Sequence, residues 1–270
     1  MEIAPVAGEL AAALSGPRIL TLDIERLPGR VELEMWHPRD FQRLNYVHPD
    51  KWSQLPTTVC LSYKWYDEKK VGFIAAWEDP EDPFYVARQA WLLIDEADWL
   101  VTFNGVNFDL KILRQDWAVA DLPMPTPWRN IDLFQVARRE FAFESKSLKH
   151  LCDRLGLPNK AGHYDSKVAQ AAADGDEAAR RKLIRYSKQD SRITELVFDR
   201  LRPYCRGINW GLYQADGTRC CTNCGSDDLE PAGWAATATQ RYPAYRCTIC
   251  GSVQRGVHRS AAVPMRGVVR

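Results

Sequence analysis

The feature that most constrains the fold is an apolar segment that contains two acids, Arg-Ile-Leu-Thr-Leu-Asp-Ile-Glu at residues 18–25. Gly-Pro precedes this segment and Pro-Gly follows it closely, so it predicts a short buried β-strand. Residues two apart in a strand point to the same face, which places Asp23 and Glu25 side by side. Adjacent carboxylates repel each other, and a divalent cation is the simplest compensation. The alternative is a solvated pair of acids at a strand end.

The composition is typical of a water-soluble globular protein. Of the 270 residues, 46% are hydrophobic and 26% are charged, which allows one substantial core and a small additional module. There is no run of about 18 apolar residues, so we expect no membrane span. Residues 1–17 include acids and lack the basic start of a signal peptide, and we therefore expect a cytoplasmic protein.

The net charge of +1 conceals an asymmetry along the chain. Residues 201–270 contain nine Arg, no Lys and four acids, so the first 200 residues carry a net charge of about −4. An acidic body with a basic end favours cation binding in one place and phosphate binding in another. An ordinary solvated surface can show the same asymmetry.

Hydrophobic periodicity predicts an α/β fold. Residues 27–55 have no clear period and predict loops with a helical turn, whereas 57–66 and 71–77 predict a β-hairpin. The remaining segments predict a helix at 82–97, a strand at 99–103, a helix at 107–117, a strand at 130–133 that opens into a helix ending near 141, and helices at 147–155, 165–173 and 177–201. We therefore expect a mixed five-stranded sheet, antiparallel at its start, with helices on its faces.

Two later stretches also place acids at specific positions. At residues 101–110 a strand ends near Asn104, Gly105 allows a sharp turn, and Asn107 or a neighbour is expected to cap the next helix. Asp109 then falls in the first helical turn, where the helix dipole favours a carboxylate for structural reasons alone.

The other stretch lies in the predicted helix at residues 177–201. Tyr186 and Asp190 are four residues apart and share a face of that helix, so the hydroxyl and the carboxylate could together orient a water. A surface Asp beside a half-buried Tyr is the alternative for this pair.

Taken in order, Asp-x-Glu, Asn-x4-Asp and Tyr-x3-Asp resemble the DEDD superfamily of 3′–5′ exonucleases, in its tyrosine subclass, whose fold is RNase H-like. Residues 104–113 look like the second exonuclease motif of family B DNA polymerases. Residues 130–133 and 147–157 are also similar to that group and its stand-alone bacterial and phage relatives. The resemblance extends from about Arg18 to Leu201.

The resemblance implies two divalent cations, Mg²⁺ or Mn²⁺, held by four carboxylates: Asp23, Glu25, Asp109 and Asp190. It also implies that Tyr186 helps to position the attacking water and that Asn104 contacts the substrate. Carboxylate ligands without His or Cys suit these hard cations rather than zinc.

One residue bears on the subclass, and two further polar residues need an interpretation. The sister subclass has a His five residues before the last Asp, and here that residue is Arg185. We expect His163 to be a loop residue rather than a general base, and Asp132 to be structural.

The cysteines predict a second metal site. Two Cys-x-x-Cys-Gly units, separated by residues 226–246, resemble a zinc ribbon and predict one structural Zn²⁺ held by four thiolates: Cys221, Cys224, Cys247 and Cys250. Cys220 could replace Cys221, although its spacing fits less well. A pair of disulfides is the alternative, and the expected cytoplasmic setting argues against it.

Arginines and aromatic residues surround these cysteines and suit contacts with nucleic acid. They are Trp234, Arg241, Tyr242, Tyr245, Arg246, Arg255, Arg259, Arg266 and Arg270, together with His258. Docking on the main domain, or on a replication or repair protein, is the alternative use of this surface.

We expect four regions: an RNase H-like exonuclease domain at 1–205, a linker at 206–217, a zinc ribbon at 218–256 and a basic tail at 257–270. The expected activity is hydrolysis of phosphodiester bonds at single-stranded 3′ ends, with DNA favoured. A non-catalytic nucleic-acid-binding or scaffolding module, an RNase and a structure-specific nuclease are the alternatives.

Overall fold

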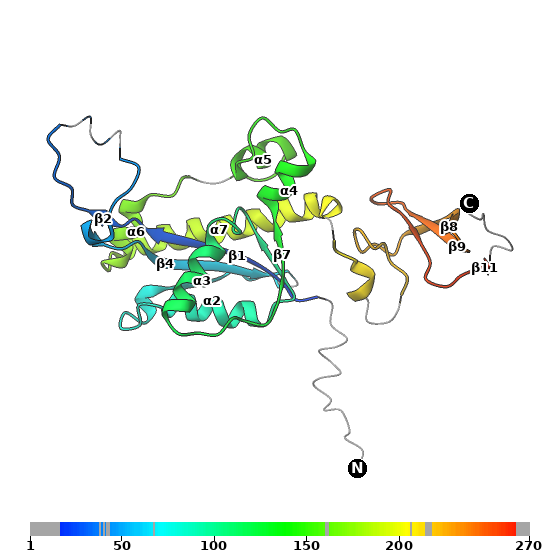
Figure 1. Ribbon diagram of the computed structural model, residues 1–270, viewed down its shortest axis with the longest axis horizontal. Helices are drawn as coiled ribbons and strands as arrows, with labels where there is room; N and C mark the ends of the chain where they lie inside the picture. Colours follow the sequence, from blue (N-terminus) through cyan, green and yellow to red (C-terminus); the bar gives the residue numbers. More distant parts are fainter. Residues whose placement is uncertain are drawn as a thin grey trace, which may run out of the picture. The chain divides into compact units, whose positions relative to one another are not determined.

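The structure is a computed structural model (Figure 1), and it describes residues 17–37, 39, 41, 44–66, 68–159, 162–205, 207–213 and 218–262. The start of the chain through residue 16, Arg266 and Arg270 lie outside these residues. The chain divides into two compact units, one formed by Arg18–Phe198 and the other including Asp199–Arg270. No helix in the described part of the chain combines the length and apolarity that a membrane crossing requires.

A mixed five-stranded sheet forms the centre of the first unit, in the order β5-β4-β1-β6-β7. The pairs β1–β4 and β4–β5 are antiparallel, whereas β1–β6 and β6–β7 are parallel. The strands are β1 (Ile19–Leu27), β4 (Thr57–Trp65), β5 (Gly72–Ala75), β6 (Trp99–Thr102) and β7 (Arg129–Asp132). The predicted sheet, antiparallel at first and parallel afterwards, is confirmed.

Helices cover both faces of this sheet (Figure 1). They are α2 (Tyr85–Asp95), α3 (Asp109–Val119), α4 (Leu133–Glu140), α5 (Leu148–Leu155), α6 (Ser166–Ala173) and α7 (Glu177–Leu201), with short 3-10 helices η2 (Pro49–Lys51) and η3 (Ala76–Glu78). Leu20, Leu22 and Ile24 of β1 pack with residues of α2 and α3 in one hydrophobic cluster. Leu27, at the end of β1, belongs to a second cluster with residues of α6 and α7.

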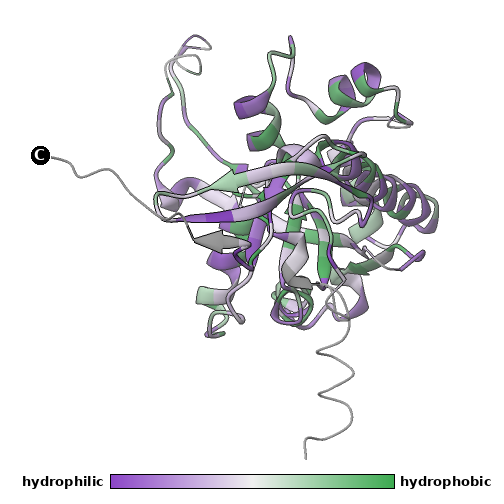
Figure 2. Ribbon diagram, turned by 90° about the vertical axis from the view of Figure 1, so that its right-hand side faces the viewer, coloured by the Kyte–Doolittle hydropathy of each residue, from purple (hydrophilic) through white to green (hydrophobic). Residues whose placement is uncertain are grey.

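This division of β1 follows from the period of a strand, because alternate side chains point to opposite faces. Hydrophobic residues accordingly lie on the central strands, and both hydrophobic and hydrophilic residues occur along the helices (Figure 2). The face of β1 that does not enter the first cluster carries Thr21, Asp23 and Glu25.

The segment between β1 and β4 differs from the prediction of loops with a helical turn. The turn is present as η2, but β2 (Arg30–Val31) and β3 (Trp52–Gln54) also pair as a small antiparallel sheet. Two-residue and three-residue strands contain too few residues for an alternating pattern to be visible in the sequence.

The second unit is built around a small antiparallel sheet in which β9 (Gln240–Cys247) pairs with β8 (Leu229–Ala236), β10 (Val253–Arg255) and β11 (Ala261–Ala262). Two 3-10 helices precede it, η4 (Arg202–Tyr204) and η5 (Trp210–Tyr213). The expected linker contains η5, where the buried Trp210 donates its backbone N–H to the Thr222 carbonyl at 3.0 Å, and the expected tail contains β11.

Candidate functional site

The acids of β1 face helix α7 because β4, their neighbour in the sheet, contacts that helix through small polar side chains. Asp23 pairs with Ser62 across the β1–β4 ladder. Ser62 Oγ lies 2.7 Å from the Ser187 carbonyl oxygen and 2.7 Å from Ser191 Oγ, and all three serines are fully buried. Because serine is small, the helix lies close to the sheet at this point.

Three carboxylates meet where α7 passes β1. Oxygens of Asp23, Glu25 and Asp190 all lie within 4.8 Å of one another. Asp190 is 4% exposed, and the two acids of β1 are half-buried. Three like charges at this spacing favour a bound cation, and their all-oxygen donor set fits Mg²⁺ or Mn²⁺ rather than zinc.

Asp109 lies beside this group but is not one of its three members. Its Oδ1 accepts the N–H of Ile24 at 3.0 Å. This N–H is free to bond to a side chain because the pairing of β1 with β6 ends at Thr21. Burial raises the pKa of Asp109 to about 6, with a further contribution from the charge of Asp132, although the bond from Ile24 opposes the change. The fourth predicted carboxylate thus contacts the backbone between the two acids of β1.

The turn before Asp109 is held by Asp132. Oδ1 of this buried carboxylate accepts the N–H of Asn104 at 2.9 Å, and Oδ2 accepts that of Val106 at 3.2 Å. Oδ1 also accepts the N–H groups of Phe134 and Gln135 at 3.0 and 3.4 Å, which caps α4. A single side chain therefore connects the turn that precedes α3 to the start of α4.

Backbone conformation in this turn differs from the prediction. We expected Gly105 to allow the sharp turn, but the residue with left-handed backbone is Asn104, with φ of 65°. Gly105 is needed for a different reason, since a Cβ there would lie 2.5 Å from the side chain of Thr102. The N-cap residue of α3 is Phe108, the neighbour of Asn107, and it makes no side-chain bond to the helix. Asn107 instead donates to Asn104 Oδ1 at 3.4 Å.

Tyr186 projects from α7 next to Asp190. Burial raises the pKa of Tyr186 far above its usual value, and the charges of Asp190 and Glu25 add to this effect. The phenol therefore stays protonated at neutral pH and donates a hydrogen bond to Asp190. It is a neutral group that can donate or accept a hydrogen bond, rather than a base.

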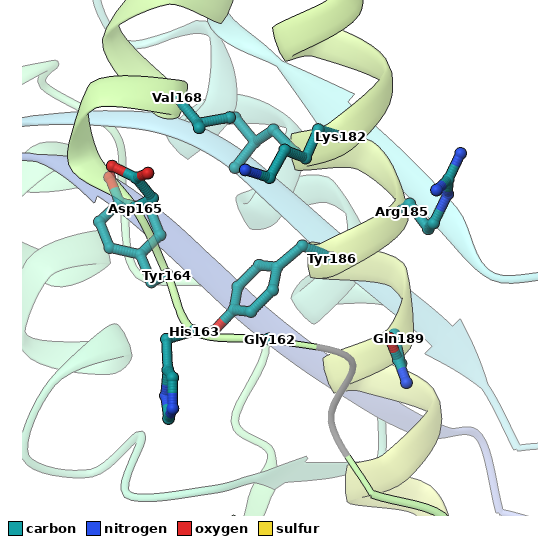
Figure 3. A pocket seen from close by; sticks show the side chains of 10 residues that line it. Gly162, His163, Tyr164, Asp165, Val168, Lys182, Arg185, Tyr186 and Gln189 are labelled. Carbon is teal, nitrogen blue, oxygen red and sulfur yellow. The ribbon is translucent and has the colours of Figure 1, made fainter.

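A cavity of about 280 Å³ lies on the other side of Tyr186. Figure 3 shows Tyr186 reaching from α7 toward residues 162–165, where His163 lies exposed in a loop. The Tyr164 ring is centred 6.4 Å from that of Tyr186, and its hydroxyl donates to the Arg26 carbonyl. Lys182 and Arg185 of α7 also line this cavity, together with the acid Asp165.

Four cysteines meet in the second unit. Sγ atoms of Cys221 and Cys250 are 3.6 Å apart, as are those of Cys224 and Cys247, and all four sulfurs lie within 4.8 Å of one another. Four thiolates around one zinc, each at about 2.3 Å, have sulfurs separated by roughly 3.8 Å. None of these cysteines forms a disulfide, and Cys220 is buried outside the group.

The two Cys-x-x-Cys-Gly units have the same local structure. Gly225 donates its N–H to the Cys221 carbonyl, and Gly251 donates to that of Cys247, each at 2.9 Å. Both glycines have positive φ, 81° and 73°, which a side chain would strain.

Thiolate character is favoured at Cys250. Partial burial opposes it, but hydrogen bonds from the Ser252 backbone and the Asn223 side chain lower the pKa of Cys250 to about 7. The geometry of the four sulfurs and the lowered pKa of Cys250 fit a structural metal site in a ribbon, whereas burial raises the pKa of Cys221 and Cys224 in the absence of a metal.

Residues 53–202, more than half of the chain, match the family model RNase_H_2, described as the RNase_H superfamily. The chain belongs to the RNase_H superfamily. Among solved structures it is similar to the family B DNA polymerase from the hyperthermophilic archaeon Pyrobaculum calidifontis, with 17% identity and a TM-score of 0.52. The match covers 85% of this chain but 33% of the polymerase chain, and at this identity the likeness concerns the fold. No curated protein matched the sequence.

Some residues that shape the candidate site were not identified from the sequence. Ser62, Ser187 and Ser191 showed no motif, because their role depends on two elements more than 120 residues apart. Asp132 had a recognisable signal, since an Asp directly before a helix is a preferred N-cap residue. Its bonds to the turn at Asn104 and Val106 have no counterpart in local sequence.

Proposed function

We propose that this chain is a metal-dependent 3′–5′ exonuclease that removes nucleotides from single-stranded 3′ ends, with DNA favoured. The observation that carries the proposal is the meeting of three carboxylates from β1 and α7 in a chain of the RNase_H superfamily. A neutral Tyr186 lies next to them, and Lys182 lines the cavity beside Tyr186, where a cationic side chain suits an anionic substrate.

The proposed cation ligands are Asp23, Glu25 and Asp190, with Asp109 as a fourth. Two Mg²⁺ or Mn²⁺ ions, when bound, activate water and offset the negative charge that develops at phosphorus. Asp109 contributes as a carboxylate, so its pKa of about 6 predicts that cation binding weakens below that pH.

Tyr186 has a different role in this proposal. Its O–H is directed to Asp190, which leaves the lone pairs of the phenol oxygen available to accept a hydrogen bond from a water. Tyr186 would therefore orient the attacking water without removing its proton. Asn104, at the turn before Asp109, is the proposed substrate contact.

The test uses DNA and RNA oligonucleotides labelled at the 5′ end and incubated with Mg²⁺ or Mn²⁺. We expect a ladder that shortens one nucleotide at a time from the 3′ end, with release of mononucleotides. Asp190→Asn should lower the rate by a factor of at least about 100, because removing a cation ligand removes transition-state stabilisation. The matched control is Asp199→Asn, an exposed acid on the same helix, which should retain full activity.

The same assay separates the alternatives. Internal cuts would favour a structure-specific nuclease, and faster shortening of RNA would favour an RNase. Binding without any cleavage in either cation would refute the exonuclease proposal and favour a non-catalytic module.

For the second unit we propose one structural Zn²⁺ bound by Cys221, Cys224, Cys247 and Cys250. A ribbon of this size buries little apolar surface, so the metal would supply much of its folding free energy. We further propose a cytoplasmic location and a replication or repair protein as partner of the ribbon. Metal analysis of the purified chain tests the zinc proposal, and we expect about one zinc per chain.

A further inference from the structure

We infer that one face of the ribbon sheet binds single-stranded nucleic acid by stacking bases on Trp234 and Tyr245. The inference deepens the proposed function, on which it rests for the class of ligand, and it assigns no catalysis to this face. The binding site lies within the second unit and is separate from the carboxylates.

The strand register places the two aromatic residues on the same face of the sheet. Trp234 of β8 pairs with Pro243 of β9, and Pro243 is two residues from Tyr245, so all three side chains point the same way. Gln254 of β10 pairs with Tyr245, so its side chain lies on the same face as these three. We call this surface, with Arg219 and Arg241, the stacking face.

Each aromatic residue of the stacking face lies next to an arginine. The Arg219 guanidinium is 4.3 Å from the centre of the Tyr245 ring, and that of Arg241 is 5.9 Å from the Trp234 ring. Trp234 is 59% exposed, Tyr245 is half-buried, and both arginines are exposed. An exposed ring beside a guanidinium offers a base a stacking surface and its phosphate a positive charge.

A cavity of about 590 Å³ adjoins Tyr245 and contains an amide group that lacks an acceptor. Gln254 Oε1 accepts the N–H of Thr222 at 2.5 Å, which fixes the orientation of the amide. Its Nε2 is buried and has no hydrogen-bond acceptor among the residues that the structure describes. A base offers carbonyl and ring-nitrogen acceptors to such a donor.

Charge favours an anionic ligand over an apolar protein partner. Residues 218–262 contain five Arg, no Lys and three acids. Arginine combines charge with a planar group that stacks on rings, which suits a ligand of alternating phosphates and bases. Binding by stacking should tolerate different base sequences, because every base has a π-face.

The test measures fluorescence anisotropy of a labelled oligothymidylate whose phosphorothioate linkages resist hydrolysis, with the full chain and no added Mg²⁺ or Mn²⁺. Trp234→Ala and Tyr245→Ala should each weaken binding roughly tenfold. The matched control is Tyr242→Ala. Tyr242 is also on β9 and is also stacked by an arginine, Arg255 at 4.2 Å, but it points to the opposite face. The Tyr242→Ala variant should change the affinity for the oligonucleotide by less than about twofold.

Unchanged affinity in Trp234→Ala and Tyr245→Ala, or an equal loss in Tyr242→Ala, would overturn the inference. If the alanine variants lose their zinc, the double variant Arg219→Gln/Arg241→Gln decides. It should reduce the slope of log affinity against log salt by about 1.4, near 0.7 for each phosphate of a single strand that an arginine no longer neutralises, and an unchanged slope would refute the site. Binding that persists in a chain without nuclease activity would refute the proposed exonuclease and leave the stacking face intact.

Discussion

Replacement of Asp132 tests whether a single carboxylate holds the candidate site in place. The side chain is 5% exposed and accepts four backbone N–H bonds, two from the turn at Asn104 and Val106 and two from the start of α4. Asp132→Ala leaves all four N–H groups without this acceptor. Loss of an N-cap costs about 1 kcal/mol, and each bond to a charged group about 1.5–3 kcal/mol at good geometry. Because two of the bonds are long, we expect a total of about 3–4 kcal/mol.

The loss of stability should depend on which carboxylate oxygen of Asp132 the substitution retains. Oδ1 accepts three of the four bonds and Oδ2 only that from Val106, so Asp132→Asn can keep three and should cost about 1–2 kcal/mol. The control is Asp165→Ala, which removes an exposed N-cap residue with a single bond, to Lys167, and should cost about 1 kcal/mol.

Thermal unfolding followed by circular dichroism measures these differences. For a unit of this size, 1 kcal/mol corresponds to about 2–4 °C, so Asp132→Ala should lower Tm by about 10 °C. Exonuclease activity, if present, should also fall, because the turn leads directly into Asp109. If Asp132→Ala lowers Tm no more than Asp165→Ala does, the four bonds do not stabilise the turn and the reasoning is wrong.

Three further predictions concern packing, metal and pH. Ser191→Leu should lower Tm by about 5–10 °C, because it overfills the contact with Ser62 and removes a buried hydrogen bond, whereas Ser191→Ala should cost only about 1 kcal/mol. Cys247→Ser, or a strong chelator, should release the zinc measured by a colorimetric dye and unfold the ribbon, seen as loss of protease resistance, with Cys152→Ser as the control. The raised pKa of Asp109 means that the folded chain binds the proton more tightly than the unfolded chain. Stability without added cation should therefore fall as pH rises from about 4 to 6, by up to about 3 kcal/mol, and urea unfolding of Asp109→Asn should show a flatter profile.

Periodicity in the sequence was sufficient for the large elements of the first unit. The predicted helix at 177–201 has the same bounds as α7, and the predicted strands and helices of the sheet are all present to within about three residues. Long segments with a clear apolar face predict well because burial of that face dominates their free energy. The short strands β2, β3 and β11 were not predicted, since their pairing depends on contacts far along the chain.

The candidate site could be predicted in part for the same reason. Strand and helix periods indicated that Asp23 and Glu25 share one face and that Tyr186 and Asp190 share another. That these faces meet depends on the buried serines, and the position of Asp109 depends on a bond to the backbone of Ile24. Both are tertiary effects that no local pattern contains.

The two faces of β1 also affect how the chain can misfold. A shift of one residue in its pairing with β4 would exchange the sides, so that Leu20, Leu22 and Ile24 would leave the core and Asp23 and Glu25 would enter it. Burying even one unpaired polar group costs roughly 2–7 kcal/mol, and a charge costs more. The two acids therefore penalise misaligned pairing of the central strand, whatever reaction they serve.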